Sequence, residues 1–133
     1  MITAVADTHV FIWYLAGDRR LSTVAKQYID RIAANSDEIA ISAITLVEII
    51  YLAEKGRLVS DWPERATSLL DEPDSPFVVA IVDREVVKSL ASLAGSGIID
   101  MPDRIIAASA LRYGVPLLTR DHVIANSPIE TLW

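Results

Sequence analysis

The sequence predicts an α/β domain, a central mostly parallel sheet of four to five strands with helices on both faces. Two observations lead to this class. Short apolar segments alternate along the chain with longer segments of helical periodicity, and most of the short segments are apolar throughout, as in parallel sheets that are covered on both sides. The 133 residues fit one domain, 1–133, which is long enough to bury a core of its own.

Five segments are expected to be strands. They are short, rich in apolar residues, and bounded by polar or turn-forming residues. The first four define the predicted sheet, and the last one would add a fifth strand. In chain order these expected strands are residues 2–6, 38–42, 77–82, 115–119 and 129–132.

The segments between the strands carry the start and stop signals of helices. Ser22 suits an N-cap position, and Gly56 follows a strong apolar helix as a C-terminal signal. Pro102 suits the first turn of the helix that Gly114 ends. The residues from Asp71 to Pro76 are expected to form a loop. The expected helices are residues 9–15, 23–34, 44–55, 61–70, 83–94 and 100–113.

Composition limits the possible functions. The net charge of −6 argues against nucleic-acid binding by general electrostatic attraction, but not against an enzyme whose acids are covered by a metal ion. No cysteine is present, so disulfides and thiolate metal sites are excluded. We expect no signal peptide, no membrane span and a cytoplasmic location. The hydrophobic fraction of 52% is high and fits either an apolar-rich core or an oligomer or partner interface.

Two acidic residues follow predicted strands. Asp7 comes directly after the first strand, and Asp121 comes two residues after Thr119, which ends the fourth. Ligands of α/β sheets bind beyond the carboxyl ends of the strands, so both residues are candidates for a functional site. Each of them alone is equally compatible with a turn former or a helix cap.

Two further acids lie on predicted helices. Asp103 shares a helix face with Ala107 and Ala110, opposite the arginines expected on the solvent side, so it should lie at the edge of the core. A metal ion would remove the cost of burying its charge, although an acid in a first helical turn is also favourable by itself. Glu48 lies opposite its helix's apolar stripe, where an ordinary solvated face is the alternative.

Four motifs in order resemble the PIN-domain family, and particularly VapC-like toxins. The first is the apolar strand that ends in Asp7-Thr8-His9, with Trp13 after it. The second is Glu48 in an apolar helix. The third is the run DMPDRIIAASA at residues 100–110, and the fourth is a strand that ends in Thr119-Arg120-Asp121. The resemblance covers essentially the whole chain.

The resemblance implies a metal-dependent ribonuclease. Asp7, Glu48, Asp103 and Asp121 would form an acidic pocket for Mg²⁺ or Mn²⁺, which prefer oxygen ligands. Asp7 and Asp103 would bind the ion directly, and Thr119 would orient Asp121. The substrate would be RNA, and the partners a cognate antitoxin and a second copy of the chain.

The chain departs from the family pattern at two positions, where many relatives carry Ser or Asn in place of His9 and place the third-motif proline one residue earlier than Pro102. The roles of His9, His122 and Asp100 therefore stay open. Two arginines and two aromatic residues near the proposed site also carry expectations. Arg104 and Arg120, each beside a proposed ligand, are candidates to steer phosphate, while Trp13 and Tyr14 are expected to be core or dimer contacts.

Three other functions fit the sequence less well. The first is a non-catalytic module of the same fold that acts through protein contacts, against which the presence of all four acids argues. A phospho-accepting receiver would need paired acids after the first strand and a lysine after the fifth, which the chain lacks. A haloacid-dehalogenase-type phosphatase would need an aspartate where His9 stands.

Overall fold

The sheet is entirely parallel and has five strands. The computed structural model describes residues 1–133 and places the strands in the order β3-β2-β1-β4-β5. The predicted α/β class is confirmed. The strands are β1 (Ile2–Ala6), β2 (Glu38–Ser42), β3 (Phe77–Ala80), β4 (Leu117–Leu118) and β5 (Thr131–Leu132).

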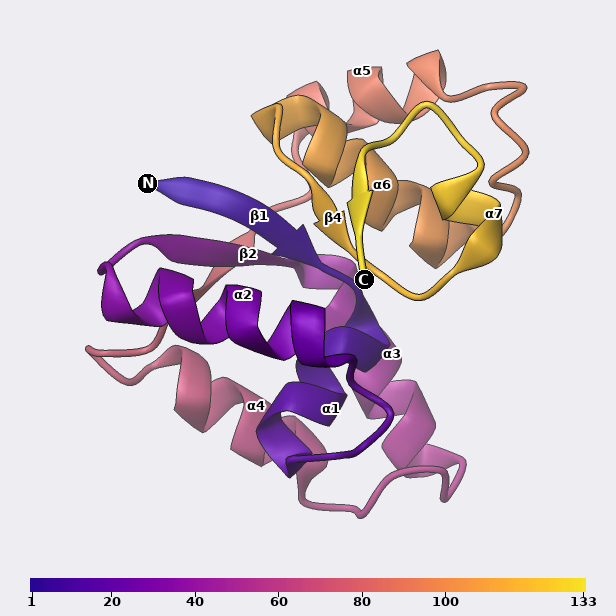
Figure 1. Cartoon of the computed structure of the whole chain (residues 1–133). Coiled ribbons are helices and arrows are strands. Elements are labelled where there is room, and N and C mark those ends of the chain that lie inside the picture. The colour runs from indigo at the N-terminus through magenta and orange to yellow at the C-terminus, as the bar shows by residue number, and fades with distance from the viewer.

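Helices cover both faces of the sheet, as predicted. Figure 1 shows α1 to α4 on one side of the sheet and α5 to α7 on the other. No helix has the length and apolar character that a membrane crossing requires. The helices are α1 (Thr8–Ala16), α2 (Thr23–Ala34), α3 (Ala43–Glu54), α4 (Trp62–Leu70), α5 (Arg84–Ser92), α6 (Met101–Tyr113) and α7 (His122–Ala125).

The alternation of side chains along β1 divides the core in two. Ala4 and Ala6 pack into one apolar cluster with Phe11 of α1, whereas Val5 packs into the other with Ile106 of α6. Successive side chains of a strand point to opposite faces, so each face of the sheet needs its own helical layer. This explains why the strands are apolar throughout.

Several helix boundaries follow the predicted signals. The hydroxyl of Ser22 accepts a hydrogen bond from the Ala25 N–H at 3.1 Å and so caps α2. Gly114 ends α6 with a positive φ of 65°, which an L side chain rarely adopts. Pro102 lies in the first turn of α6, where its missing N–H costs nothing.

Strands β3 and β4 end earlier than predicted because their partner strands end. Ala80 pairs with Ser42, the last residue of β2, so Ile81 and Val82 continue past the sheet and are exposed. Leu118 pairs with Ala6, the last residue of β1. Beyond these points the neighbouring chain turns into a helix and offers no further ladder. The fifth strand is likewise limited to the two residues that face β4.

Two expectations about the carboxyl-terminal half were wrong. The short helix α7 was not expected, and Asp121 is its cap. The face of α6 that carries Arg104 and Ala108 was expected to face solvent, but Ala108 is fully buried. The Arg104 guanidinium donates a hydrogen bond to the Leu90 carbonyl of α5 at 3.0 Å. Because α5 packs along α6, this face is an interface between helices.

Candidate active site

The carboxyl ends of β1 and β4 bring two of the predicted acids to one edge of the sheet. The two strands are parallel neighbours, and their arrowheads meet near the middle of the molecule in Figure 1. Asp7 follows β1 directly, and Asp121 follows β4 after two intervening residues. A ligand site at this edge is typical of open α/β sheets.

One cavity collects three of the four predicted acids. Its volume is about 320 Å³, and most of its lining residues are polar or charged. Asp7, Asp103 and Asp121 come to it from three different elements, although 114 positions separate the first from the last (121 − 7). The other lining residues are His9, Val10, Trp13, Arg20 and Arg120.

Asp7 is the most deeply placed of these acids. Its residue is 9% exposed, and burial raises the pKa of its carboxyl, while a hydrogen bond from Thr119 and the nearby His9 oppose this rise. The Thr119 hydroxyl donates to Asp7 Oδ2 at 2.6 Å and accepts from the Asp121 N–H at 3.0 Å. Thr119 was expected to orient Asp121, and it does contact Asp121, through the backbone N–H. Its hydroxyl also binds the Asp7 carboxylate, which was not expected.

The charge of the cavity is concentrated around Asp103. Burial is the first cause that raises the pKa of Asp103 to about 7, and the carboxylates of Asp7, Asp100, Asp121 and Glu48 add to it. None of these five acids takes part in an ion pair. The site therefore holds several carboxylates without a direct ion-pair partner, which is costly where solvent is partly excluded.

Glu48 lies beside this cavity and is not one of its lining residues. It is partly buried, and burial raises the pKa of its carboxyl. The Thr8 hydroxyl donates to Glu48 Oε1 at 2.6 Å and lies 2.9 Å from the Thr45 hydroxyl. A hydroxyl has a single proton, so Thr45 donates to Thr8 in this chain of hydrogen bonds. The alternative of an ordinary solvated position for Glu48 is wrong.

The threonines behind Glu48 were missed at the sequence level. Thr45 precedes Glu48 by one helical turn in α3, and Thr8 follows Asp7 directly. The spacing of three residues places Thr45 and Glu48 on neighbouring positions of one helix face. The contact with Thr8 depends on how α1 packs against α3, which no local pattern encodes.

Two of the acids are also helix caps. Asp121 Oδ1 accepts from the Val123 and Ile124 N–H groups at 2.7 and 3.2 Å, which leaves Oδ2 without a donor. Asp100 caps α6 by accepting from the Asp103 N–H at 3.1 Å. The cap alternative raised for Asp121 is thus realised. A carboxylate has two oxygens, so capping by one of them leaves the other available to a ligand.

The basic residues and histidines form two groups, those that line the cavity and those that lie away from it. Arg120 and His9 line the cavity, as does Arg20, which was not among the two arginines favoured from the sequence. The prediction that Arg104 steers phosphate is wrong, because its guanidinium binds the Leu90 carbonyl and does not line the cavity. His122 is exposed at the start of α7 and does not line the cavity.

The donor atoms of the site are carboxylate oxygens, which suit a hard divalent cation. No group of three or more His, Asp or Glu side chains is arranged so that it could hold one ion by itself. Mg²⁺ commonly uses one or two protein carboxylates and completes its shell with water and substrate oxygens. The uncompensated acids around Asp103 fit such a cation.

Comparison with known proteins places the chain in a family. Residues 4–128 match the family model of the PIN domain. The chain is similar to Ribonuclease VapC22 of Mycobacterium tuberculosis (strain ATCC 25618 / H37Rv), with 32% identity over 121 residues. This alignment covers 91% of the chain and 88% of the relative.

Solved structures share the fold over nearly the whole chain. One is a toxin-antitoxin complex from Klebsiella pneumoniae, with 26% identity, a TM-score of 0.70, and coverage of 98% of this chain and 97% of that one. VapBC2 from Rickettsia felis, solved bound to a DNA fragment from its promoter, is 19% identical with a TM-score of 0.72 and coverage of 99% and 98%. The second is a likeness of fold alone. With the four motifs in order, the parallel sheet and the acidic cavity at its carboxyl edge, this chain belongs to the PIN-domain family.

Proposed function

We propose that this protein is a divalent-metal-dependent endoribonuclease and the toxin of a toxin–antitoxin pair. The observation that carries the proposal is the cavity at the sheet edge, where Asp7, Asp103 and Asp121 gather without a salt-bridge partner. Its similarity to a protein named as a ribonuclease supports the same activity. The reaction would hydrolyse a phosphodiester bond of RNA.

Asp7 and Asp103 are the side chains that would hold the cation directly, with Asp121 and Glu48 acting directly or through water. A cation favours the ionised form of both direct ligands, against the burial that raises their pKa values. Hydrogen bonds from Thr119 and Thr8 keep Asp7 and Glu48 in fixed orientations. Ligands that are oriented before binding lose little freedom when the cation arrives.

When bound, Mg²⁺ or Mn²⁺ lowers the pKa of a water ligand and offsets charge on the phosphoryl oxygens. The chain's own residues set the conditions for this chemistry. The buried Asp7 carboxylate supplies a fixed negative charge, and Glu48, held by Thr8, can orient a water molecule or accept its proton. His9 also lines the cavity, and its role stays open.

The test is cleavage of a broad panel of fluorescently labelled single-stranded and structured RNAs by the purified protein. We expect cleavage with Mn²⁺ or Mg²⁺ and none in excess EDTA, with Asp103→Asn at least tenfold slower. The matched control is Asp83→Asn, because Asp83 caps α5 outside the cavity. Equal activity in EDTA, or no cleavage of any RNA with either metal, would overturn the proposal.

The partners follow from the same proposal. One structure similar to this chain is described as a toxin-antitoxin complex, and we propose that the chain binds a cognate antitoxin and forms a homodimer in the cytoplasm. The alternative is a non-catalytic module of the same fold. The two are separated by the cleavage assay, because a module without activity would bind its partner yet cleave no RNA.

A further inference from the structure

Arg120 and Arg20 both lie on Trp13 at the mouth of the acidic cavity. The guanidinium carbon of Arg120 is 4.6 Å from the centroid of the Trp13 ring, and that of Arg20 is 5.1 Å away. All three residues line the cavity with the acids. Trp13 itself is only 4% exposed, so its ring is held by the core and provides a fixed platform for the two cations.

The two arginines differ in what else they bind. Arg20 is paired with Asp18 through two hydrogen bonds, from Nε to Oδ1 at 3.1 Å and from Nη2 to Oδ2 at 2.8 Å. Arg120 has no salt-bridge partner and donates no side-chain hydrogen bond. It is exposed, so its five N–H groups are free to bind a ligand.

We propose that Arg120, held over the ring of Trp13, binds an RNA phosphate next to the one that is hydrolysed. This inference rests on the proposed ribonuclease function. Arg120 immediately precedes Asp121, so a phosphate bound to it is adjacent to the acidic cavity. A guanidinium binds phosphate oxygens with two parallel hydrogen bonds, and stacking on a ring orients it before the ligand arrives.

The charge balance of the chain explains why such a cation is needed. The net charge is −6, and the cavity concentrates unpaired acids, so RNA is repelled from the site until positive charge is supplied. A metal ion at the acids compensates for the phosphate at the reacting bond. The charge of that ion is shared between the acids and the reacting phosphate, so the next phosphate of the strand stays uncompensated. Arg120 provides the charge at the next position.

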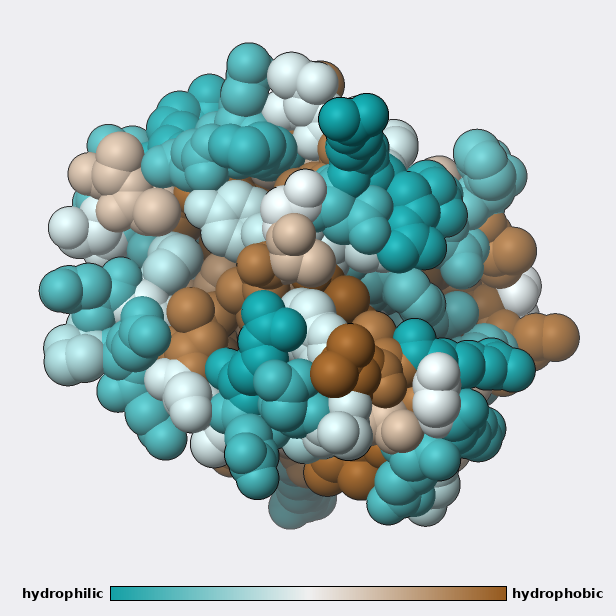
Figure 2. Space-filling view, turned by 90° about the horizontal axis from the view of Figure 1, so that it is seen from below, coloured by the Kyte–Doolittle hydropathy of each residue, from teal (hydrophilic) through white to brown (hydrophobic).

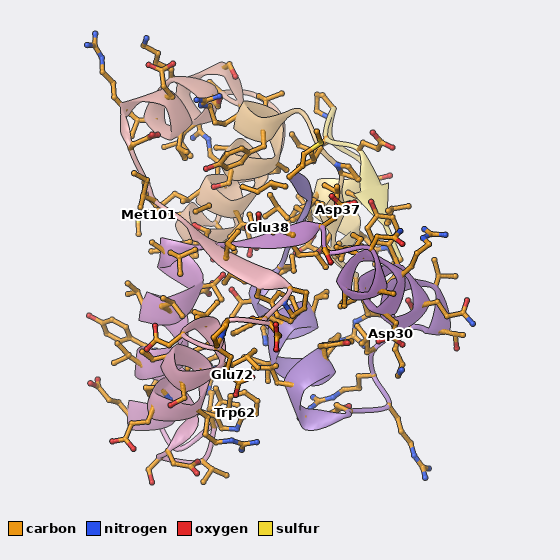
Figure 3. The ribbon with its side chains drawn as sticks, turned by 90° about the vertical axis from the view of Figure 1, so that its left-hand side faces the viewer. Asp30, Asp37, Glu38, Trp62, Glu72 and Met101 are labelled. Atoms are coloured by element: carbon orange, nitrogen blue, oxygen red, sulfur yellow. The ribbon has the colours of Figure 1, made fainter.

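An arginine on an aromatic ring can also be only a packing contact, and the chain contains such a pair for comparison. Arg65 lies over Trp62 at the same 4.6 Å, both in α4, and lines a different cavity. Figure 3 labels Trp62 on this helix. Arg65 is exposed and forms no ion pair, so Arg65→Gln removes the same charge from the same kind of contact outside the site.

The experiment compares Arg120→Gln, Arg120→Lys and Arg65→Gln with the unmodified protein on one short RNA. For Arg120→Gln we expect KM to rise about tenfold or more with kcat unchanged, the loss expected for a charge-assisted contact that is present equally before and during reaction. The slope of log kcat/KM against log salt concentration should shrink by about 0.7, the effect of one phosphate contact on a single strand. The KM of Arg120→Lys should lie between those of Arg120→Gln and the unmodified protein. Arg65→Gln should match the unmodified protein in both KM and salt dependence.

A direct binding measurement separates failure of this inference from failure of the proposed function. Fluorescence anisotropy of the same RNA is followed with Ca²⁺ in place of Mg²⁺. If the protein cleaves RNA but Arg120→Gln changes neither KM nor binding, the inference is overturned and the function stands. If no RNA is cleaved yet binding is lost in Arg120→Gln and kept in Arg65→Gln, the phosphate contact stands without hydrolysis. If RNA is neither cleaved nor bound, both are wrong.

Discussion

At the residue scale, the raised pKa of Asp103 makes the stability of the metal-free protein depend on pH. The pKa rises from an ordinary 3.8 to about 7, first because of burial and then because of the surrounding carboxylates. The folded state therefore binds a proton more tightly than the unfolded chain does. This contribution to stability is fully present below pH 4 and is lost as pH rises towards and through about 7. Asp7 and Glu48 shift in the same direction.

The first prediction is that Asp103→Asn stabilises the metal-free protein, because the substitution removes the charge of the side chain and keeps its shape. At pH 8 without metal, the substitution should raise the free energy of unfolding by about 1 kcal/mol, well below the full value of the pKa shift because the partly exposed carboxyl is screened by solvent. The melting temperature should rise by about 3–5 °C for a domain of this size. Thermal melts monitored by circular dichroism measure this.

Two further melts complete the test of Asp103. At pH 4 the difference between the two proteins should largely disappear, because Asp103 is then mostly protonated in the folded state. With Mn²⁺ at 100 times its dissociation constant the unmodified protein should gain about 2.7 kcal/mol, and Asp103→Asn clearly less. A variant that melts well below the unmodified protein at pH 8 and gains equally from Mn²⁺ would show that Asp103 is structural.

At the element scale, the strands and helices could be predicted wherever a local signal sets their limits. The cap at Ser22, the glycine at 114 and the apolar strands β1 and β2 belong to this class. The ends of β3 and β4 could not be predicted, because they depend on where β2 and β1 stop. Local β-propensity continues into Ile81 and Val82, but a strand also needs a partner.

The same limit applies to the candidate site. Asp7 and Asp121 could be proposed because parallel strands place their carboxyl ends at one edge, and Asp103 because it shares a helix face with Ala107 and Ala110. The role of Arg104 was mistaken, and the bond from Thr119 to Asp7 was missed, because both depend on contacts across the fold. Arg104 binds Leu90 of α5, and Asp7 follows the end of β1. Helical periodicity identifies the faces of α6. It does not say that a second helix covers the face with arginine.

Asp121 caps the short helix α7 and is also a proposed metal ligand, and two substitutions distinguish these roles. Asp121→Asn keeps a good cap and removes the charge, so stability should change by less than about 0.5 kcal/mol while RNA cleavage falls at least tenfold. Asp121→Ala removes both N–H contacts at the start of α7 and should cost about 1 kcal/mol in addition. Urea unfolding and initial cleavage rates measure the two effects.

Asp83 is the matched control for this pair. It caps α5 by accepting from the Val86 N–H at 3.0 Å and does not line the acidic cavity. Asp83→Ala should cost a similar amount of stability and leave the cleavage rate unchanged. If Asp121→Asn cleaves RNA at the normal rate, the carboxylate of Asp121 is only a cap and the proposed metal pocket loses a member.

At the scale of the whole molecule, the apolar surplus is divided between core and surface. Two clusters of 15 and 13 buried residues fill the two faces of the sheet. Many large apolar side chains still remain exposed, including Ile99 at 93% and Met101 at 64%. Figure 2 shows apolar side chains gathered near the centre of one face and surrounded by hydrophilic ones. The high hydrophobic fraction therefore supplies an apolar core and leaves apolar side chains exposed, and an interface on that surface stays a prediction.

The helix that carries Trp13 and Tyr14 is not the source of this apolar surface. Trp13 is buried, and Tyr14 packs on Phe77 and donates to Asp30 at 2.8 Å. A better candidate is the shallow apolar groove between α3 and the start of α6, whose lining includes Val47, Tyr51 and Met101. Figure 3 shows Met101 at the outer edge of the molecule. We define these three residues as the α3–α6 groove.

The last prediction concerns the homodimer. If the α3–α6 groove is its interface, Met101→Glu should weaken the dimer about tenfold or more, because it would bury a further carboxylate in a mostly apolar groove that Glu48 also lines. The monomer should keep its melting temperature, since Met101 is largely exposed within one chain. Val24→Glu on α2 is the control, because Val24 is 55% exposed and lies outside the groove. Light scattering at micromolar concentration should give a dimer for the unmodified protein and the control. A monomeric unmodified protein would contradict the dimer, and a dimeric Met101→Glu would place its interface elsewhere.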